Sequence, residues 1–516
     1  MSSSSVTVPG SSGSIVTVAP GTGDVLRLAE HIGFILGQSS TAGGLSIVTT
    51  SGSIPSAPSL TGGQSLTELV ISGAGPGSAT IPAGYNYVAN TANTAQTLTG
   101  SNINLVGGTV GSSYIVSGNS TVAATGGNNT VSASGTYVLS FGAGSNKVLA
   151  DGSGTVAAGP GTTLVDAVGS GNLVWAGTGS TTVDSGGANN SIFGSYNGTG
   201  GTLTAALSSA NDLVSLGDSS GSVTTSGSGA FVQGGVAGTT LTIDDIGSHD
   251  VFNGLASNEV ATLGGSAAYL QGGVAGSTMT VVDAGANDTI NALSSSVAVT
   301  ANGSGLYVNG GTGALTFVGG ASSSTVLGSS TGSTVTAGAG GVRFDLNGTN
   351  NLASGTAGST STIFGSADTS VTFTGAGNLV YSASTGNATL NAANATGNVN
   401  AWLPGSGSGA DSITTGSGND TLTAGAGSDT LNAGAGTNLF LFLDGQTGGA
   451  TDYITDSVAN IANDTFSFNN YGAAPTESIV GGHVTLTLSD NTTIVFTNLT
   501  SESQLTGHIN VYNATV

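Results

Sequence analysis

Three aspartates recur every nine residues near the C-terminal end of the sequence. Asp411, Asp420 and Asp429 hold the fifth place of the nonapeptides GSGADSITT, GSGNDTLTA and GAGSDTLNA, and Asn438 holds that place in the next, GAGTNLFLF. No Lys or Arg follows Arg343, so no basic side chain of this region balances the carboxylates. They must be neutralised by protons or by a bound cation.

The nine-residue period predicts how these side chains lie relative to one another. If two nonapeptides form one coil, Asp411 and Asp429 stack on one edge of successive coils, and Asp420 lies above Asn438 on the opposite edge. Stacked strands lie about 4.8 Å apart, where two carboxylates repel by roughly 3 to 4 kcal/mol at an effective dielectric of about 20. A divalent cation between them removes this repulsion. Asp oxygens and turn carbonyls suit Ca²⁺, and the lack of His and Cys here excludes zinc.

The stretch Ser406–Leu443 resembles the RTX repeat, whose pattern is G-G-x-G-x-D-x-U-x with a large aliphatic residue at U. The first Gly of each unit is replaced, by Ser406, Thr415, Ala424 and Ala433. The resemblance implies a parallel β-roll that holds Ca²⁺ between its turns. It also implies a secreted, extracellular protein of Gram-negative bacteria, exported by the type I secretion machinery and folded in external calcium.

On this resemblance we expect one well-formed calcium site at Asp411 with Asp429 and a weaker one around Asp420. A solvated array of turns without an ion is the alternative. The residues expected to supply carboxylate, amide or carbonyl oxygens are Asp411, Asp420, Asp429, Asn438, Gly407, Gly409, Gly416, Gly418, Gly425 and Gly427.

The residues after the nonapeptides are similar to the cap that closes RTX arrays. Asp452 and Asp456 either bind an additional ion or are exposed turn carboxylates, and Ser457 stands where the family has Phe. The runs HVTLTL, from His483, and TIVFTNL predict a hairpin. By the same resemblance, residues 460–516 are the candidate secretion signal.

Composition narrows the class of protein. The 516 residues include 90 Gly and no Cys, only 6% are charged, and the formal net charge is −23. The sequence has no cluster of basic residues that could bind nucleic acid or an anionic membrane electrostatically. Residues 1–20 lack the pattern of a cleavable signal peptide, and no run of 18 apolar residues predicts a transmembrane segment.

Internal repeats predict a β-solenoid. Three blocks of 38 residues, 211–248, 249–286 and 287–324, align without gaps, each opening with Asn or His followed by Asp. Such blocks stack coil upon coil, either as one large coil of 38 residues or as two of about 19. Phe231, Tyr269 and Tyr307 share one place in the blocks. We expect them to fill the core, with a sugar-stacking face as the alternative.

Two segments read as helix. Residues 24–38 show helical spacing of apolar residues, and this helix is expected to cap the solenoid or to dock on a neighbouring subunit. A shorter helix is predicted from Ser65, where Glu68 completes a capping-box pattern.

The predicted fold class is therefore all-β. It is a parallel β-solenoid with a short C-terminal RTX β-roll and a small N-terminal helical segment. We divide the chain into an N-terminal region, 1–100, a degenerate-repeat solenoid, 101–400, the RTX β-roll, 401–443, and a cap with the secretion signal, 444–516.

Three functions compete on the sequence alone. The first is a calcium-dependent extracellular structural protein whose partners are further copies of itself, in a surface layer, filament or biofilm matrix. The second is a cell-surface adhesin that binds polysaccharide. The third is a secreted polysaccharide-active enzyme. No catalytic constellation is recognisable, and Lys147 and Arg343 are isolated, so we expect a protein that is not an enzyme.

Overall fold

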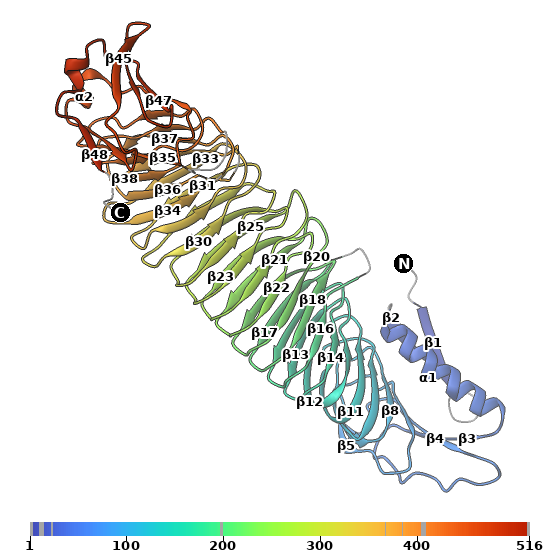
Figure 1. The fold of residues 1–516 in the computed structure, drawn as a ribbon. Coiled ribbons are helices and arrows are strands. Elements are labelled where there is room, and N and C mark those ends of the chain that lie inside the picture. The colour runs from blue at the N-terminus through green and yellow to red at the C-terminus, as the bar shows by residue number, and fades with distance from the viewer. Residues whose placement is uncertain are drawn as a thin grey trace. The chain divides into compact units, whose positions relative to one another are not determined.

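The computed structural model describes residues 4–9, 15–21, 24–196, 200–366, 368–383, 385–403 and 409–512. The chain forms two compact units, residues 1–260 and 261–516. Each is a parallel β-solenoid in which a strand pairs with its counterpart one coil away (Figure 1). The predicted fold class is confirmed. No helix among the described residues is long and apolar enough to cross a membrane.

The core of the first unit is a stack of identical positions. Its register is seen in β14 (Leu173–Trp175), β16 (Ser191–Phe193), β18 (Leu213–Gly217), β20 (Phe231–Gly235) and β22 (Val251–Asn253). The second residue of each strand, Val174, Ile192, Val214, Val232 or Phe252, lies directly above its counterpart and is fully buried. Alternate residues of a strand point to opposite faces, so one apolar residue per strand builds a continuous column. Burial of each stabilises the fold by about 1.5–3 kcal/mol.

The predicted N-terminal helix is confirmed as α1 (Asp24–Thr41), drawn in blue in Figure 1. It packs across β4 (Leu66–Ile71), β6 (Tyr87–Asn90), β8 (Asn104–Gly107) and β10 (Asn119–Ala124). The buried residues of this contact are Val25, Ala29, Ile32 and Leu36 of the helix and Val70, Ala89, Val106 and Ala123 of the strands. The helix therefore lies along the flank of its own solenoid, and its docking on a neighbouring subunit stays a prediction.

The helix predicted from Ser65 is wrong, because this segment is strand β4. Leu69 and Ile71 enter the core, while Val70 lies beneath α1. A strand that is buried on both faces shows a continuous apolar run instead of alternation, which hides its period. Its pairing with β3 (Leu45–Thr50) and β6 decides the conformation.

The 38-residue block is resolved in the second unit into two coils. There β24 (Tyr269–Gln271) pairs with β26 (Thr289–Asn291), which pairs with β28 (Tyr307–Asn309). Tyr269 aligns with Thr289, 20 residues on, and Thr289 with Tyr307, a further 18. Both tyrosines face outward, Tyr307 with 39% of its surface exposed, and so does Phe231 in the first unit. The expectation that these aromatics fill the core is therefore wrong.

Each block opens with a turn residue followed by an inward carboxylate. His249 has φ 59° and Asn211 φ 60°, in the left-handed region that Asn and His tolerate better than most residues. The next residue, Asp250 or Asp212, is buried. Asp250 Oδ1 accepts the backbone N–H of Ala230 at 2.7 Å, one coil earlier. Such a carboxylate satisfies a backbone donor that the strand ladder leaves without an acceptor.

A lone carboxyl in the first unit gives a prediction about pH. Glu68 is fully buried in β4, and neither of its carboxyl oxygens has a hydrogen-bond partner among the described residues. Burial raises the pKa of Glu68 to about 8. The folded protein tolerates the protonated form of Glu68 and disfavours the ionised form. The stability that the protonated form allows is therefore present near pH 4.5 and is lost as the pH rises through 8.

We expect Glu68→Gln to exceed the wild type in unfolding free energy by on the order of 3 kcal/mol at pH 9 and to match it near pH 4.5. Chemical denaturation at constant calcium, followed by circular dichroism, measures the difference. The control is Glu30→Gln, at an exposed position of α1. If Glu68→Gln and the wild type kept parallel pH profiles, the buried carboxyl would not be ionised in the way described.

Candidate metal centre

The strands around the periodic aspartates have the predicted coil length. Ser412 in β39 (Ser412–Thr414) aligns with Thr430 in β41 (Thr430–Asn432), 18 residues on. Thr421 in β40 (Thr421–Thr423) aligns with Leu439 in β42 (Leu439–Leu443), again 18 residues on. Two nonapeptides therefore make one coil, and their polar residues form two columns on opposite edges.

The first column consists of Asp411, Asp429 and Asp452. The Asp411 backbone N–H donates to Asp429 Oδ1 at 3.1 Å, and the Asp429 N–H donates to Asp452 Oδ1 at 3.0 Å. Asp411 Oδ1 accepts the N–H of Ala388, one coil earlier, at 2.6 Å. Each carboxylate thus accepts a backbone N–H of the preceding coil through its Oδ1 atom, and the three side chains form one stack.

The second column consists of Asp420, Asn438 and Asp464. The Asp420 N–H donates to Asn438 Oδ1 at 2.9 Å, and the Asn438 N–H to Asp464 Oδ1 at 3.1 Å. Sequence reasoning missed Asp464, because it lies 26 residues after Asn438 and not 18. The extra chain includes the short helix α2 (Val458–Ile461). Only the pairing of β42 with β44 (Thr465–Asn469) reveals the alignment.

Asp452 and Asp456 are fully buried. Asp456 Oδ2 accepts the N–H of Ala433 at 2.7 Å, and its Oδ1 accepts that of Gly434 at 2.9 Å. The alternative that these two are exposed turn carboxylates is therefore wrong. The cap that follows contains the predicted hairpin, β46 (His483–Thr487) with β47 (Thr493–Phe496).

Burial makes these carboxyls keep their protons to a higher pH than an exposed Asp does. Burial raises the pKa of Asp452 to about 8, with repulsion from Asp429 and Asp490 adding to it against one backbone hydrogen bond. Burial likewise raises the pKa of Asp464 to about 7 and that of Asp411 to about 6. The field at these columns therefore favours a positive charge.

The residues present fit a hard cation. The second carboxyl oxygens of Asp420, Asp452 and Asp464 are buried and lack a hydrogen-bond partner among the described residues. Within the described ranges no group of three or more His, Cys, Asp or Glu side chains gathers at one point. Backbone carbonyls would therefore have to complete the six to eight oxygens that Ca²⁺ prefers.

The glycines expected to take part bring such carbonyls close. A side chain on Gly416, Gly418 or Gly427 would overlap the carbonyl oxygen of Ala395, Gly397 or Gly409 on the preceding coil. The Gly425 N–H donates to Asp429 Oδ2 at 2.9 Å. Gly407 lies outside the described residues. Glycine is thus needed where one backbone passes tightly over the next.

Comparison with known families decides what this segment is. The model of the RTX calcium-binding nonapeptide repeat, in four copies, matches residues 406–440. This segment is an RTX calcium-binding β-roll. The RTX match covers a small part of the chain, and no curated protein and no solved structure matches the sequence. The molecule is therefore a calcium-binding repeat protein, while the individual ligands of the ion stay a prediction.

A buried acidic pair outside the RTX segment differs from these columns. In the first unit, Thr225 Oγ1 lies 2.5 Å from Asp245 Oδ1 and 3.0 Å from Asp250 Oδ2. Burial raises the pKa of Asp250 to about 6, and hydrogen bonding to Asp245 adds to the rise. One Thr hydroxyl has one hydrogen, so Thr225 can donate to only one of the two carboxyls at a time.

Replacement of Asp429 tests the first column. Asn438 shows that an amide keeps the bond to the preceding coil, so Asp429→Asn is expected to fold, while losing the charge and the hydrogen bond from the Gly425 N–H to Oδ2. We expect its calcium affinity to fall at least about tenfold, which is about 1.4 kcal/mol. Isothermal titration of the full chain measures this.

The matched control for Asp429→Asn is Asp184→Asn, at an exposed position of β15 (Ser180–Ser185). Calcium affinity and stoichiometry should stay unchanged in this variant. Equal calcium binding by Asp429→Asn and the wild type would contradict the assignment of Asp429 as a ligand.

Proposed function

We propose that this protein is a secreted, calcium-dependent structural protein that assembles with copies of itself outside the cell. The assembly would be a surface layer, a filament or a biofilm matrix. The RTX segment supports the proposal, because proteins with RTX repeats are typically secreted and because the β-solenoid fold is typical of non-enzymatic structural proteins.

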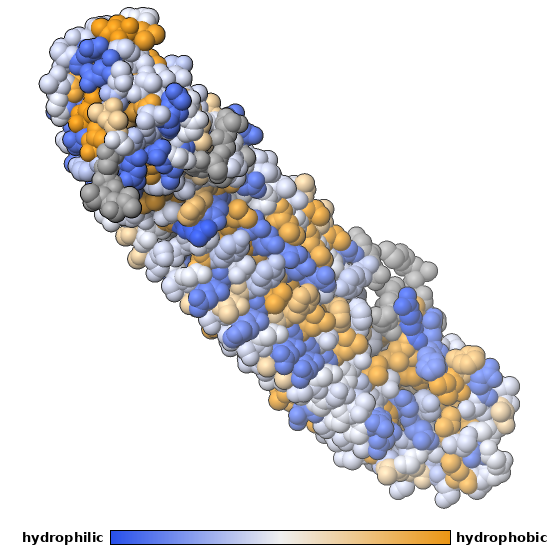
Figure 2. All heavy atoms as spheres, viewed as in Figure 1, coloured by the Kyte–Doolittle hydropathy of each residue, from blue (hydrophilic) through white to orange (hydrophobic). Residues whose placement is uncertain are grey.

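The observation that carries the proposal is the low charge of the outward faces. Only 6% of residues are charged, and outward strand positions hold mostly Ser, Thr, Ala and Val. Large apolar side chains stand exposed among them in the first unit, for example Ile115, Val138, Leu149 and Leu164. Figure 2 shows such residues scattered over the visible face between weakly polar ones. Two such faces can pack together without removing charged groups from water. The desolvation of charged groups is the main free-energy cost of burying a polar surface.

Calcium would act as the folding signal at the C-terminal end. The stacked carboxylates repel one another without an ion, and in the RTX segment they tie successive coils together through backbone hydrogen bonds. A chain kept from calcium inside the cell would leave these coils unformed. The type I secretion machinery, with residues 460–516 as the signal, would then export an unfolded end that folds on meeting external calcium.

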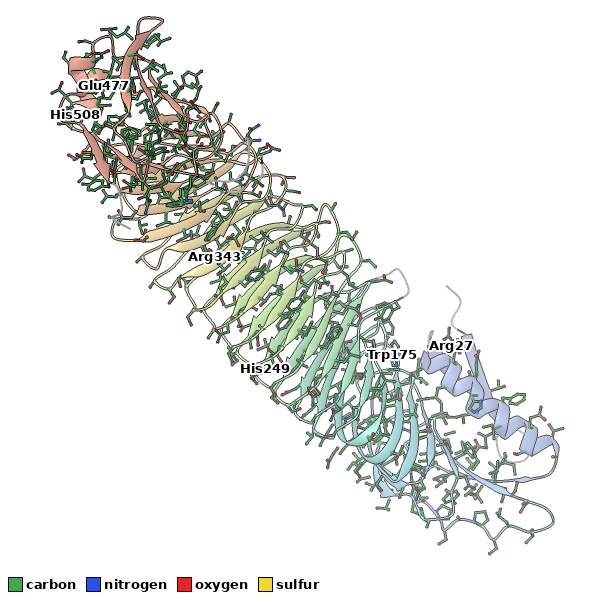
Figure 3. All side chains as sticks on the ribbon, viewed as in Figure 1. Arg27, Trp175, His249, Arg343, Glu477 and His508 are labelled. Atoms are coloured by element: carbon green, nitrogen blue, oxygen red, sulfur yellow. The ribbon has the colours of Figure 1, made fainter. Side chains whose placement is uncertain are left out.

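Arg343, one of the three basic residues of the chain, has a structural role. Arg343, labelled in Figure 3, contacts Asp345 on the same strand, β32 (Val342–Asp345), with Nε to Oδ1 at 3.1 Å. Its guanidinium also lies 4.6 Å from the centre of the Phe364 ring. These contacts supply a reason for Arg343 that needs no reaction, and we propose that the chain is not an enzyme.

The assembly is expected to depend on calcium. Electron micrographs of the purified protein should show an ordered lattice or fibre with calcium and dispersed particles after EGTA. Asp429→Asn in calcium should resemble the EGTA sample, and Asp184→Asn should resemble the wild type. A monomer at every calcium concentration would overturn self-assembly. An ordered array that persisted unchanged in EGTA would overturn the role of calcium alone.

A further inference from the structure

One outward column in the first unit changes character where α1 begins. Under the helix its members are small, and they align in register from coil to coil. The column continues through β11 (Thr130–Phe141), β12 (Ser145–Ala157), β14 and β16. Its successive members are Val70, Ala89, Val106, Ala123, Ser140, Ala157, Trp175 and Phe193. Small side chains therefore support the helix, and aromatic ones begin beyond it.

The aromatic part is a platform open to solvent. The rings of Trp175 and Phe193 are stacked, with centroids 4.7 Å apart and planes at 22°. Tyr196 meets Trp175 edge-on, with centroids 6.2 Å apart. The Tyr196 hydroxyl lies 2.8 Å from Ser215 Oγ, which holds the ring in place. Trp175 remains 37% exposed and Tyr196 51%. Three rings arranged in this way leave apolar surface uncovered that the core does not use.

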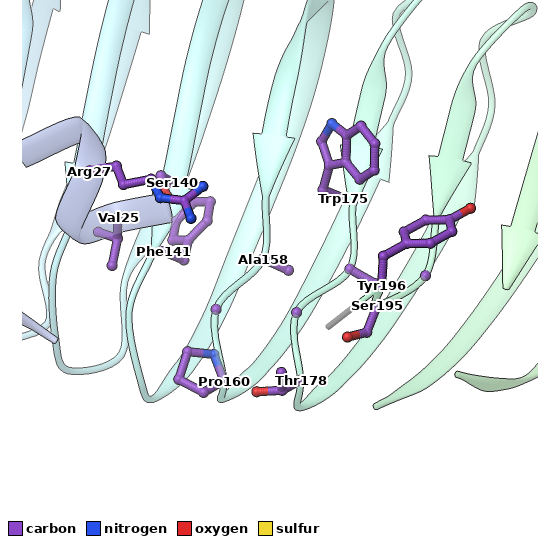
Figure 4. A pocket seen from close by; sticks show the side chains of 14 residues that line it. Val25, Arg27, Ser140, Phe141, Ala158, Pro160, Trp175, Thr178, Ser195 and Tyr196 are labelled. Carbon is purple, nitrogen blue, oxygen red and sulfur yellow. The ribbon is translucent and has the colours of Figure 1, made fainter. Parts of the chain in front are cut away.

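A cleft of about 320 Å³ lies beside this platform (Figure 4). Val25 and Arg27 of α1 line it on one side, and Trp175 and Tyr196 line it on the other. Ser140, Thr178 and Ser195 add hydroxyl groups. The cleft thus combines an aromatic wall, a row of hydroxyls and one guanidinium.

One polar atom in the cleft is left unsatisfied. Ser140 is only 3% exposed, and its Oγ has no hydrogen-bond partner among the described residues. A buried hydroxyl without a partner costs roughly 1–3 kcal/mol. In the column of small residues, Ser140 stands between Ala123 on the preceding coil and Ala157 on the following one. Alanine would avoid this cost, so the hydroxyl indicates a ligand group that completes it.

We propose that this cleft binds a saccharide that carries a carboxylate, such as a uronic acid unit of an acidic polysaccharide. A sugar ring has an apolar face of C–H groups and a rim of hydroxyls, which match the Trp175 face and the serine and threonine hydroxyls. The volume lies near the lower end of about 300–1,000 Å³ for small-molecule sites, which fits one or two sugar rings. This inference is independent of the RTX segment and of self-assembly.

Charge decides between acidic and neutral sugars. The chain has a net charge of −23 and three basic residues, and one of these, Arg27, lines the cleft. A carboxylate is repelled by most of this molecule and is attracted next to a guanidinium, whose fork can bind both carboxylate oxygens. The sugar therefore presents its carboxylate to α1 and its ring face to Trp175.

The two tryptophans of the chain provide a matched experiment. Trp402, in β38 (Val399–Trp402) of the second unit, is 40% exposed and lies outside the cleft. Oligogalacturonate is titrated into the full chain in calcium, with tryptophan fluorescence and isothermal titration as readouts. A change in emission is expected for the wild type and for Trp402→Phe, and none for Trp175→Phe. Trp175→Ala is expected to weaken binding at least tenfold.

Arg27→Gln separates charge recognition from stacking. We expect this variant to lose the preference for oligogalacturonate over a neutral cello-oligosaccharide of the same length. Circular dichroism and thermal melting show whether each variant is folded. Wild-type affinity in folded Trp175→Ala, or no binding of either sugar by the wild type, would overturn the proposal. Dimerisation that Trp175→Ala abolishes, without sugar binding, would assign the cleft to a second copy and overturn it too.

Discussion

Parallel strands stacked in register impose one constraint on every residue of this protein. Each side chain lies about 4.8 Å from its counterpart on the coil above and on the coil below. Apolar residues gain from this arrangement, since they form columns such as the one that contains Val174 and Ile192. Like charges are destabilised by this arrangement, because each carboxylate is repelled by the carboxylate stacked on the neighbouring coil. A solenoid of this length must therefore be nearly neutral, or must supply a counter-ion where it is not.

The buried Asn and Asp columns follow from the same constraint. In the 38-residue blocks a residue in the left-handed conformation precedes a side chain that points inward and accepts a backbone N–H of the preceding coil, and Asn438 of the RTX segment accepts such an N–H as well. Asparagine does this without charge, and aspartate adds a charge that must be neutralised. In the 38-residue blocks the opening carboxylates, such as Asp212 and Asp250, stand 38 residues or two coils apart, whereas in the RTX segment Asp411 and Asp429 are direct neighbours. The spacing along the chain thus decides where two carboxylates are stacked directly on one another.

The flank of the first unit shows how stacking also creates surfaces. Small residues repeated at one position make a flat strip on which α1 packs through Val25, Ala29, Ile32 and Leu36. Where Trp175 and Phe193 take over the strip, Trp175 stays 37% exposed near Val25 and Arg27 of the helix's first turn. A cleft arises at this step between a covered and an uncovered part of one column.

Much of the structure follows from local periods in the sequence. The nine-residue spacing predicted the coil of 18 residues, since a period of Gly, Asp and one aliphatic residue leaves a single way to stack. The hairpin from His483 and the helix of residues 24–38 were also readable, because alternation and helical spacing involve neighbours along the chain. The outward direction of Tyr269 and Tyr307 was not readable, since a three-residue strand gives no alternation from which to choose a face.

The sequence by itself determined the class of fold, the period of the RTX coils and the need for protons or a cation where carboxylates recur without a basic partner. These depend on spacing along the chain and on charge, which are present before folding. Only the tertiary structure decided that Ser65–Glu68 begins a strand, that Asp464 joins the second column and that Trp175 flanks a cleft with Arg27. Each of these is set by contacts between residues far apart in sequence, where burial and pairing across coils outweigh local preference.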